Sequence, residues 1–153
     1  MEIDYMFVDR TPLRRMTPNS AGIDLPADQD VTIKPGDREI IPTGIAVALP
    51  PGSVGLVCSR SGLAWEQGVF VLNAPGVIDA DYRGQIYVIM ANMGKQERKI
   101  RRGDRIAQLV CVPCLMWGMR QVDTLPPSGS RGVDGIGSTG VSSEQSEQPK
   151  AQG

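Results

Sequence analysis

The chain has seventeen aspartate and glutamate residues but no histidine. Catalytic groups of the Ser-His-Asp and Cys-His kinds are therefore excluded, and so is any metal site built on histidine. A hydrolase formed by this sequence would need a carboxylate, or a water bound to a metal ion, as its general base. Aspartates set among other polar groups in tight turns are thus the first candidates for chemistry.

The stretch NAPGVIDADYRGQI, residues 73–86, places Asp79 and Asp81 next to Tyr82. Its Pro-Gly and Arg-Gly signals predict a hairpin that leads into a strand. Turns often collect Asp and Gly for local hydrogen bonds, so a purely structural role for the carboxylates is the alternative. Tyr82 favours a functional role, because it offers a flat apolar face beside an acid–base group.

Two further stretches offer donors for an anion. CSRSGLA sets Arg60 and Ser61 at the start of a predicted short helix, where free backbone N–H groups can hold phosphate oxygens. A serine cap with a surface arginine would look the same. RGVDGIGSTG, residues 131–140, lacks the lysine and helix of a P-loop. Its glycine-rich backbone could still wrap a phosphate chain, although flexible tails share this composition.

Asp24 lies between two apolar residues in SAGIDLPA, where it is either an outward-facing or turn-capping group or a functional one. RRGDRIAQLV places Gln108 in a predicted buried strand, in which its amide must find partners. We expect Asp104 and Arg105 to form a structural ion pair at the entrance of that strand.

Turn signals at short intervals separate short runs of strand character, as in TGIAVALP, GQIYVIMAN and RIAQLVCVP. This pattern predicts an all-β antiparallel sandwich or barrel. Only residues 61–68, SGLAWEQG, have a helical start, good helix formers and a glycine stop. From Val141 onward the composition predicts a solvated, disordered tail.

A formal net charge of −1 argues against a general nucleic-acid binder. Twelve of the sixteen basic residues are nevertheless arginine, the side chain suited to bidentate phosphate contacts. Three cysteines without a second Cys-x-x-Cys pair predict buried thiols in a reducing compartment rather than a zinc site. No membrane span or signal-peptide pattern is present, so we expect a cytoplasmic protein, or an intracellular one in the host if the source is viral, that is not secreted.

Taken in order, the five stretches resemble the five motifs of the trimeric dUTPase family. The matching segments are Ala21-Gly22-x-Asp24-Leu25, Arg60-Ser61-Gly62-Leu63-Ala64, Gly76-Val77-Ile78-Asp79-x-x-Tyr82-Arg83-Gly84, Gly103-Asp104-Arg105-x-Ala107-Gln108 and Arg131-Gly132…Gly135-x-Gly137-Ser138-Thr139-Gly140. The likeness runs from about Ile3 to Gly140.

The resemblance implies a jelly-roll-like β-barrel with one short helix and a flexible C-terminal arm, assembled as a homotrimer with active sites shared between subunits. It places the barrel domain at residues 1–130, a glycine-rich phosphate-binding lid at 131–140 and a disordered tail at 141–153. It also implies no stable nucleic-acid binding and no membrane association.

The implied reaction is hydrolysis of dUTP to dUMP and pyrophosphate, which limits uracil incorporation into DNA and supplies dUMP for thymidylate synthesis. Asp79 matches the family's catalytic aspartate, which orients and deprotonates the water that attacks the α-phosphorus. Mg²⁺ is the implied cofactor. It is held by the triphosphate, and Asp24 matches a residue that contacts it through water.

The implied substrate site reads a deoxyuridine nucleotide. Tyr82 matches the tyrosine that lies against the deoxyribose and leaves no room for a 2′-hydroxyl, and the backbone near Asn73 would hydrogen-bond the uracil edge. The full set of implied substrate-binding residues is Arg60, Ser61, Gly62, Asn73, Gly76, Tyr82, Gln108, Arg131, Ile136, Gly137, Ser138 and Thr139.

Three positions depart from the family pattern. Ile136 stands where most members carry an aromatic residue that stacks on uracil, so we expect weaker substrate binding or less complete lid closure. Asp134 stands where glycine is usual, and either repels the triphosphate or, as we favour, points outward. Gln85 replaces a common glutamate, to which we attach little weight.

Two other functions remain open. A dCTP deaminase shares the fold, but its pattern has Arg-Ser-Ser where this chain has Gly62, and a catalytic glutamate where this chain has Asp79. A nucleotide-gated regulatory protein on the same fold is the second alternative, for which Ile136 and Asp134 are the supporting features.

Overall fold

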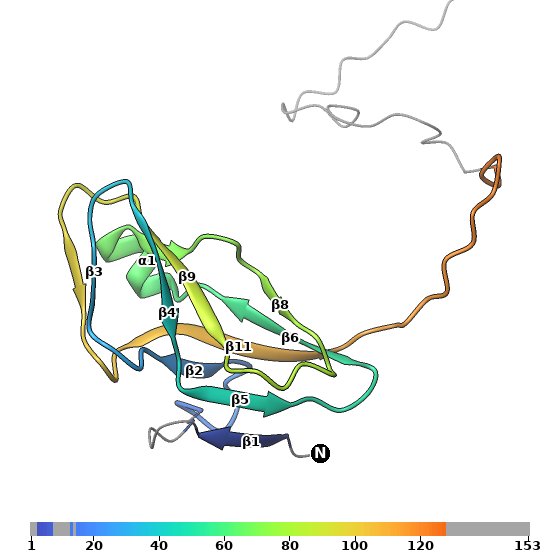
Figure 1. Ribbon diagram of the computed structural model, residues 1–153, viewed down its shortest axis with the longest axis horizontal. Coiled ribbons are helices and arrows are strands. Elements are labelled where there is room, and N and C mark those ends of the chain that lie inside the picture. The colour runs from blue at the N-terminus through green and yellow to red at the C-terminus, as the bar shows by residue number, and fades with distance from the viewer. Residues whose placement is uncertain (1–2, 8–12, 14, 128–153) are drawn as a thin grey trace, which may run out of the picture. The chain divides into compact units, whose positions relative to one another are not determined.

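The structure is a computed structural model that describes residues 3–7, 13 and 15–127 (Figure 1). Within these ranges the chain forms eleven strands and one short helix. In chain order these are β1 Asp4–Phe7, β2 Ile23–Pro26, β3 Val31–Ile33, β4 Arg38–Pro42, β5 Ile45–Ala48, β6 Ser53–Cys58, α1 Ser61–Gln67, β7 Val69–Val71, β8 Gly76–Ile78, β9 Tyr87–Asn92, β10 Arg98–Ile100 and β11 Arg105–Pro113. The predicted all-β class with one short helix is confirmed.

The strands pair antiparallel throughout. A four-stranded sheet has the order β2-β11-β6-β8, and a three-stranded sheet has the order β4-β9-β7. Two further pairs join β1 to β5 and β10 to β3. This arrangement is jelly-roll-like, although the described strands do not close into one continuous barrel.

The core is aliphatic, as the scarcity of aromatic residues predicts. Its fully buried side chains include Leu25, Ile33, Ile45 and Leu109, and none of the buried core residues is aromatic. The buried amide of Asn92 is satisfied: its Nδ2 donates to two backbone carbonyls, and its Oδ1 accepts from a backbone N–H. Because burial here is mainly apolar, the polar candidates for chemistry must lie on the outer faces and edges of the sheets.

The register of the four-stranded sheet places three polar side chains in one row. Asp24 of β2 pairs with Gln108 of β11, which pairs with Cys58 of β6. Side chains directly opposite each other in an antiparallel pair project from the same face of the sheet. The neighbours Leu25 and Leu109 therefore project from the other face, into the core. One face of this sheet builds the core and the other carries the candidate site.

The predicted hairpin over residues 73–86 is wrong in its strand pairing. A turn is present, since the N–H of Tyr82 donates to the carbonyl of Asp79 at 3.1 Å. The flanking strands, however, belong to different sheets: β8 pairs with β6, whereas β9 pairs with β4 and β7. Because the two strands belong to different sheets, the segment between them is a corner that connects these sheets.

The chain divides into two units, residues 1–117 and 118–153. In the second unit only residues 118–127 are described, and these form neither helix nor strand. The predicted lid at 131–140 and tail at 141–153 lie outside the described residues. Among the residues that the structure describes, no helix is long and apolar enough to span a bilayer. The three cysteines are free and half-buried.

Candidate active site

Three of the predicted stretches, far apart in the sequence, meet around one cavity of about 370 Å³ at an end of the four-stranded sheet. The cavity brings together five predicted site residues, namely Asp24, Arg60, Ser61, Gly62 and Gln108. Met16, Ser20, Ala21 and Gly22 complete its lining. A small polyanion in this hollow would meet arginine, hydroxyl and amide donors at once.

Asp24 holds two arginines at the cavity wall. Its Oδ1 lies 3.2 Å from Nε of Arg60, and its Oδ2 lies 3.1 Å from Nη1 of Arg105. The predicted pair between Asp104 and Arg105 is therefore wrong. Asp104 closes its own turn by accepting the backbone N–H of Arg101 at 2.8 Å, which leaves Arg105 to cross to the neighbouring strand.

The Arg60 guanidinium is fixed at one edge and open at the other. Besides its pair with Asp24, Nη1 donates to the carbonyl of Arg105 at 2.9 Å. A guanidinium has five N–H donors, so three are left for a ligand. These two contacts hold the Arg60 side chain in position, while its other N–H groups remain available to an anion.

Helix α1 starts directly after Arg60, without a side-chain cap, and ends at Gly68 in the left-handed conformation at φ 68°. Ser61 is the first helical residue and not the cap, so the serine-cap alternative does not describe this helix. An alanine Cβ placed at Gly62 would meet nothing within 4 Å. Packing therefore does not require glycine there, whereas a ligand approaching the backbone would.

Gln108 is positioned by its neighbours. Its Nε2 donates to the carbonyl of Ser59 at 3.0 Å. A Cβ at Gly22 would overlap Gln108 Oε1 and lie 3.1 Å from its Cδ, so a side chain at residue 22 would displace this amide. The second hydrogen on Nε2 remains available for an oxygen in the cavity.

The remaining described site residues gather around β8. Asp79 and Asn73 lie at its two ends, and the amide of Asn73 lies 3.3 Å from the position of a Cβ at Gly76. The Tyr82 hydroxyl donates to the carbonyl of Gln85 at 2.9 Å. A Cβ at Gly84 would overlap the Tyr82 hydroxyl oxygen, so the ring can occupy this place only because residue 84 is glycine.

Asp79 lies far from the cavity in the same chain. The β6–β8 register sets Gly76 opposite Val57 and Ile78 opposite Gly55, so β8 runs away from Arg60. Continuing this register places Asp79 beside Val54, six residues along the chain from Arg60. At about 3.3 Å per residue this separation is at most about 20 Å, because β6 itself ends at Cys58. One copy of the chain therefore carries two separate halves of the predicted site.

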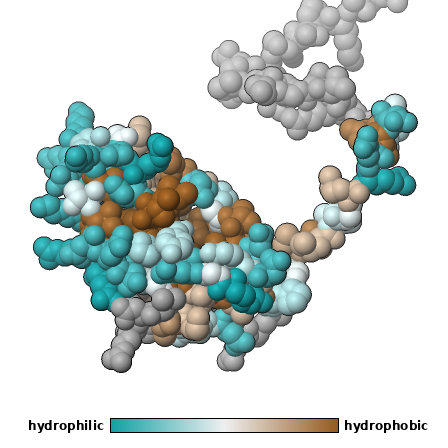
Figure 2. All heavy atoms as spheres, in the orientation of Figure 1, coloured by the Kyte–Doolittle hydropathy of each residue, from teal (hydrophilic) through white to brown (hydrophobic). Residues whose placement is uncertain are grey.

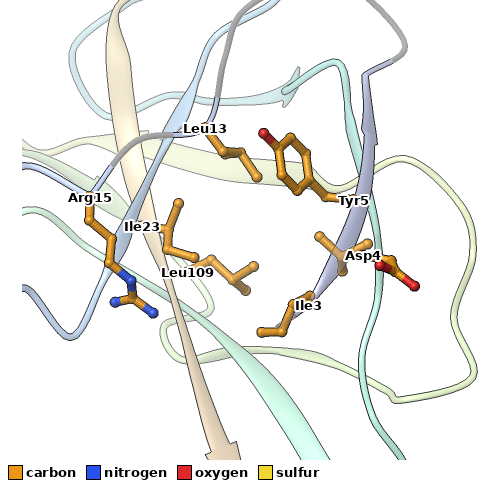
Figure 3. Close-up of a pocket in the computed structure, with 8 residues that line it drawn as sticks. Ile3, Asp4, Tyr5, Leu13, Arg15, Ile23 and Leu109 are labelled. Carbon is orange, nitrogen blue, oxygen red and sulfur yellow. The ribbon is translucent and has the colours of Figure 1, made fainter. Parts of the chain in front are cut away.

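A second cavity, of about 450 Å³, lies between β1 and the four-stranded sheet (Figure 3). Ile3, Leu13, Ile23 and Leu109 give it an apolar lining, and none of the predicted site residues that the structure describes lines it. Arg15 at its rim donates from Nη1 to the carbonyls of Ser20 and Ala21, which border the first cavity. Arg15 thus connects the second cavity to the first through these hydrogen bonds. Of these two cavities, only the first is lined by predicted site residues that the structure describes, Asp24 among them.

The described residues do not form a metal cage. Asp24 is the one carboxylate among those that line the first cavity, and residues 3–7, 13 and 15–127 contain no cluster of three metal-ligating side chains. Mg²⁺ often keeps several waters and takes its other ligands from one or two carboxylates and substrate phosphates. A Mg²⁺ that arrived on substrate phosphates would find Asp24 as the described carboxylate of this cavity.

Sequence reasoning missed Arg105 and Ser59 as supporting residues. The sequence predicts a local pair for Arg105 and gives no signal for Ser59, whose carbonyl accepts a hydrogen bond from Gln108 and whose Oγ accepts the N–H of Val71 at 3.0 Å. The register between β2, β11 and β6 was the missing information, and no local signal encodes it. The predicted lid residues Arg131, Ile136, Gly137, Ser138 and Thr139 lie outside the described residues.

Comparison with known proteins decides the family, because the sequence model of the dUTPase family matches residues 10–140. The chain belongs to the dUTPase family. It is 50% identical over 127 residues to the deoxyuridine 5′-triphosphate nucleotidohydrolase of Anaeromyxobacter sp. (strain Fw109-5), covering 83% of this chain and 86% of the relative. It is 51% identical over 131 residues to the enzyme of the same name from Corynebacterium jeikeium, covering 84% of each chain.

Solved structures of the family share this fold. The Staphylococcus bacteriophage 80alpha dUTPase with dUPNHPP superposes with a TM-score of 0.84 at 27% identity, over 92% of this chain and 99% of that chain. A mutant of the dUTPase from phage phi11 of S. aureus, described with a structural Mg(II) ion, superposes with a TM-score of 0.75 at 26% identity, over 81% and 98%. This dUTPase-family chain therefore has the family's fold over nearly its whole described length.

Proposed function

We propose that this chain, a dUTP diphosphatase, cleaves dUTP to dUMP and pyrophosphate by in-line attack of water on the α-phosphorus. The supporting observation is the convergence of Asp24, Arg60, Ser61, Gly62 and Gln108 on one cavity, with the family match over residues 10–140. The reaction would remove dUTP before uracil enters DNA and supply dUMP for thymidylate synthesis.

Asp79 is the proposed general base. It follows β8 directly and is accessible to solvent, and in a chain without histidine a carboxylate is the side chain suited to take the proton from the attacking water. Its neighbour Tyr82 would pack against the deoxyribose and exclude a 2′-hydroxyl. The bond from Tyr82 to the Gln85 carbonyl and the lack of a side chain at Gly84 fix the ring for that contact.

The triphosphate is proposed to occupy the cavity beside Asp24. Arg60 would use its free N–H groups, and the backbone at Ser61 and Gly62 would approach the phosphates closely because no side chain intervenes at residue 62. Gln108 would donate its second amide hydrogen. Uracil would be read by backbone groups near Asn73 and Gly76.

Asp24 is proposed to have two tasks. It orders Arg60 and Arg105 through its ion pairs, and it would hold the water shell of Mg²⁺ at the edge of the phosphate site. Bound on the triphosphate, Mg²⁺ would offset the charge that builds on the phosphate oxygens in the transition state.

A homotrimer with shared sites is proposed because β8 runs away from Arg60 within one chain and carries Asp79 toward the opposite end of β6. Exposed apolar side chains gather over β9 and β8 (Figure 2), and the exposed apolar residues of the strands include Ile40, Val77 and Tyr87. Leu115, Met116, Trp117 and Met119 are also exposed. Such surface is typical of a subunit interface.

Mixing two inactive variants tests the shared site. Asp79→Asn and Arg60→Ala each damage a different half of the site, so co-refolded trimers should regain activity at about a quarter of sites if each site uses two chains. Mixtures of two Asp79→Asn preparations serve as the control. If the mixture is no more active than either variant alone, active sites are not shared between chains. A monomer in light scattering would contradict the trimer.

A pyrophosphate-release assay tests the substrate. Turnover of dUTP, with dCTP, dTTP and UTP left intact, is expected. The regulatory alternative has one supporting observation: the Staphylococcus bacteriophage 80alpha dUTPase, 27% identical to this chain, is described among phage dUTPases that control transfer of virulence genes. Binding of dUTP without turnover would favour a regulatory function for this chain.

The glycine-rich segment 131–140 is proposed as the lid. Arg131, Gly137, Ser138 and Thr139 would add donors to the phosphates, and Ile136 would cover the uracil. We propose the same division for the rest of the chain, with a barrel domain at residues 1–130 and a disordered tail at 141–153.

A further inference from the structure

A basic cavity of about 350 Å³ lies beside the proposed phosphate site. Helix α1, strands β7 and β10 and the turn before β11 enclose it, with Leu63 and Val69 among its apolar lining. Arg60 lines both this cavity and the one beside Asp24. The basic cavity and the proposed phosphate site are therefore adjacent and share Arg60 in their walls.

Arg98 is an inward-facing cation in this cavity. It alternates along β10 with exposed Lys99 and shares a face of the strand with buried Ile100. Its Nε is buried and has no hydrogen-bond partner among the described residues. A buried charged donor without a partner is costly, so an occupant that accepts this hydrogen bond would be stabilised strongly.

The charge of the cavity selects an anion. Arg60, Arg98, Lys99 and Arg105 line it, against the single carboxylate of Asp104. Lys99 projects from the opposite face of β10, and Asp24 outside the cavity pairs with Arg60 and Arg105, so the three arginines against these two carboxylates leave a formal charge of +1. Asp104 is also engaged by the backbone N–H of the residue three positions before it. The cavity is thus suited to an oxyanion, which would accept the hydrogen bond that Arg98 Nε lacks.

The lining also limits the size and shape of the ligand. None of its residues is aromatic, so nothing in it would stack on a nucleobase. Three arginines in a hollow of about 350 Å³ favour a compact inorganic anion over a nucleotide. We propose that this cavity binds inorganic pyrophosphate through Arg98, with Arg60 as the link to the adjacent site. That the reaction itself supplies the pyrophosphate rests on the proposed function, whereas the binding does not.

Pyrophosphate titration of the full-length protein by calorimetry tests the site. Wild type should bind pyrophosphate at this cavity in addition to the phosphate site beside Asp24. Arg98→Met should lose the additional binding event, weakening it roughly 10- to 100-fold as expected for one charge-assisted hydrogen bond. Arg38→Met is the matched control, because it removes an exposed arginine on β4 that does not line the cavity.

The outcomes separate clearly. Equal titrations for wild type and Arg98→Met would overturn the site, and so would sulfate binding as tightly as pyrophosphate, because the cavity would then be a general oxyanion site. Should Arg98→Met fail to fold, the ¹⁵Nε–H resonance of Arg98 in wild type decides: a shift with pyrophosphate supports the site and an unchanged resonance overturns it. If dUTP is not hydrolysed but the Arg98-dependent binding is present, only the proposed function fails.

Discussion

The packing of Gly22 against Gln108 connects the stability of the fold to the chemistry of the site. An alanine at residue 22 would place its Cβ on top of Gln108 Oε1 and 3.1 Å from Gln108 Cδ, a separation that real Cβ contacts rarely show. The amide must therefore move, and its bond to the Ser59 carbonyl is lost or weakened. We expect the free energy of unfolding to fall by about 1–3 kcal/mol, the typical cost of overpacking together with one lost hydrogen bond.

The same displacement should reduce activity. A donor moved by about 1 Å can cost up to 100-fold in rate, so Gly22→Ala should lower kcat/KM for dUTP by about 10- to 100-fold. In thermal unfolding the midpoint should drop by roughly 2–12 °C. Both changes follow from one steric contact.

Gly62→Ala is the matched control, since it adds the same methyl group to open space in α1. Alanine is favoured over glycine in helices by up to about 1 kcal/mol, so stability should hold or rise. Its kcat/KM should nevertheless fall, because the methyl group blocks the close approach of a phosphate to the backbone. Gly22→Ala with parental stability and activity would refute the positioning of Gln108, and full activity in Gly62→Ala would refute the phosphate contact.

Three further predictions concern single residues. Ile136→Phe should tighten substrate binding, by up to about 1–3 kcal/mol if the ring stacks on uracil; unchanged KM and kcat would contradict this role. Asp134→Gly should leave KM for dUTP unchanged even at low salt, and a KM that falls most at low salt would show that Asp134 repels the triphosphate. Burial raises the pKa of the Cys111 thiol, an effect that Arg15 partly opposes. The native thiol should therefore resist iodoacetamide at about pH 8 far more than after unfolding, as mass spectrometry of the alkylated peptide can measure.

Local chemistry explains which features the sequence could predict. The serine start, helix formers and glycine stop of residues 61–68 specify α1, and Gly68 adopts the left-handed conformation that ends it. The apolar run around Gln108 predicts a buried strand; β11 is present there, although Gln108 itself is only half-buried. These signals act over a few residues, where propensity and turn chemistry decide the conformation.

Contacts between distant strands could not be derived in this way. The pairing of Asp24 with Arg105 depends on the β2–β11 register, and the separation of β8 from β9 depends on which sheet each strand joins. Both were predicted wrongly from local proximity, as an Asp104–Arg105 pair and as a hairpin. The five site stretches could nevertheless be identified from the sequence, because matching them to the family motifs requires residue types and order but not the pairing of the strands.

The catalytic role of Asp79 is tested most directly by comparing Asp79→Asn with Asp81→Asn. Both variants remove one solvent-accessible carboxylate from the same turn, so their charge and stability effects should match. Steady-state hydrolysis of dUTP should fall about 100- to 10,000-fold in Asp79→Asn, the range lost with a general base, while Asp81→Asn stays near the parent. An Asp79→Asn variant that hydrolyses dUTP as fast as the parent would contradict the account.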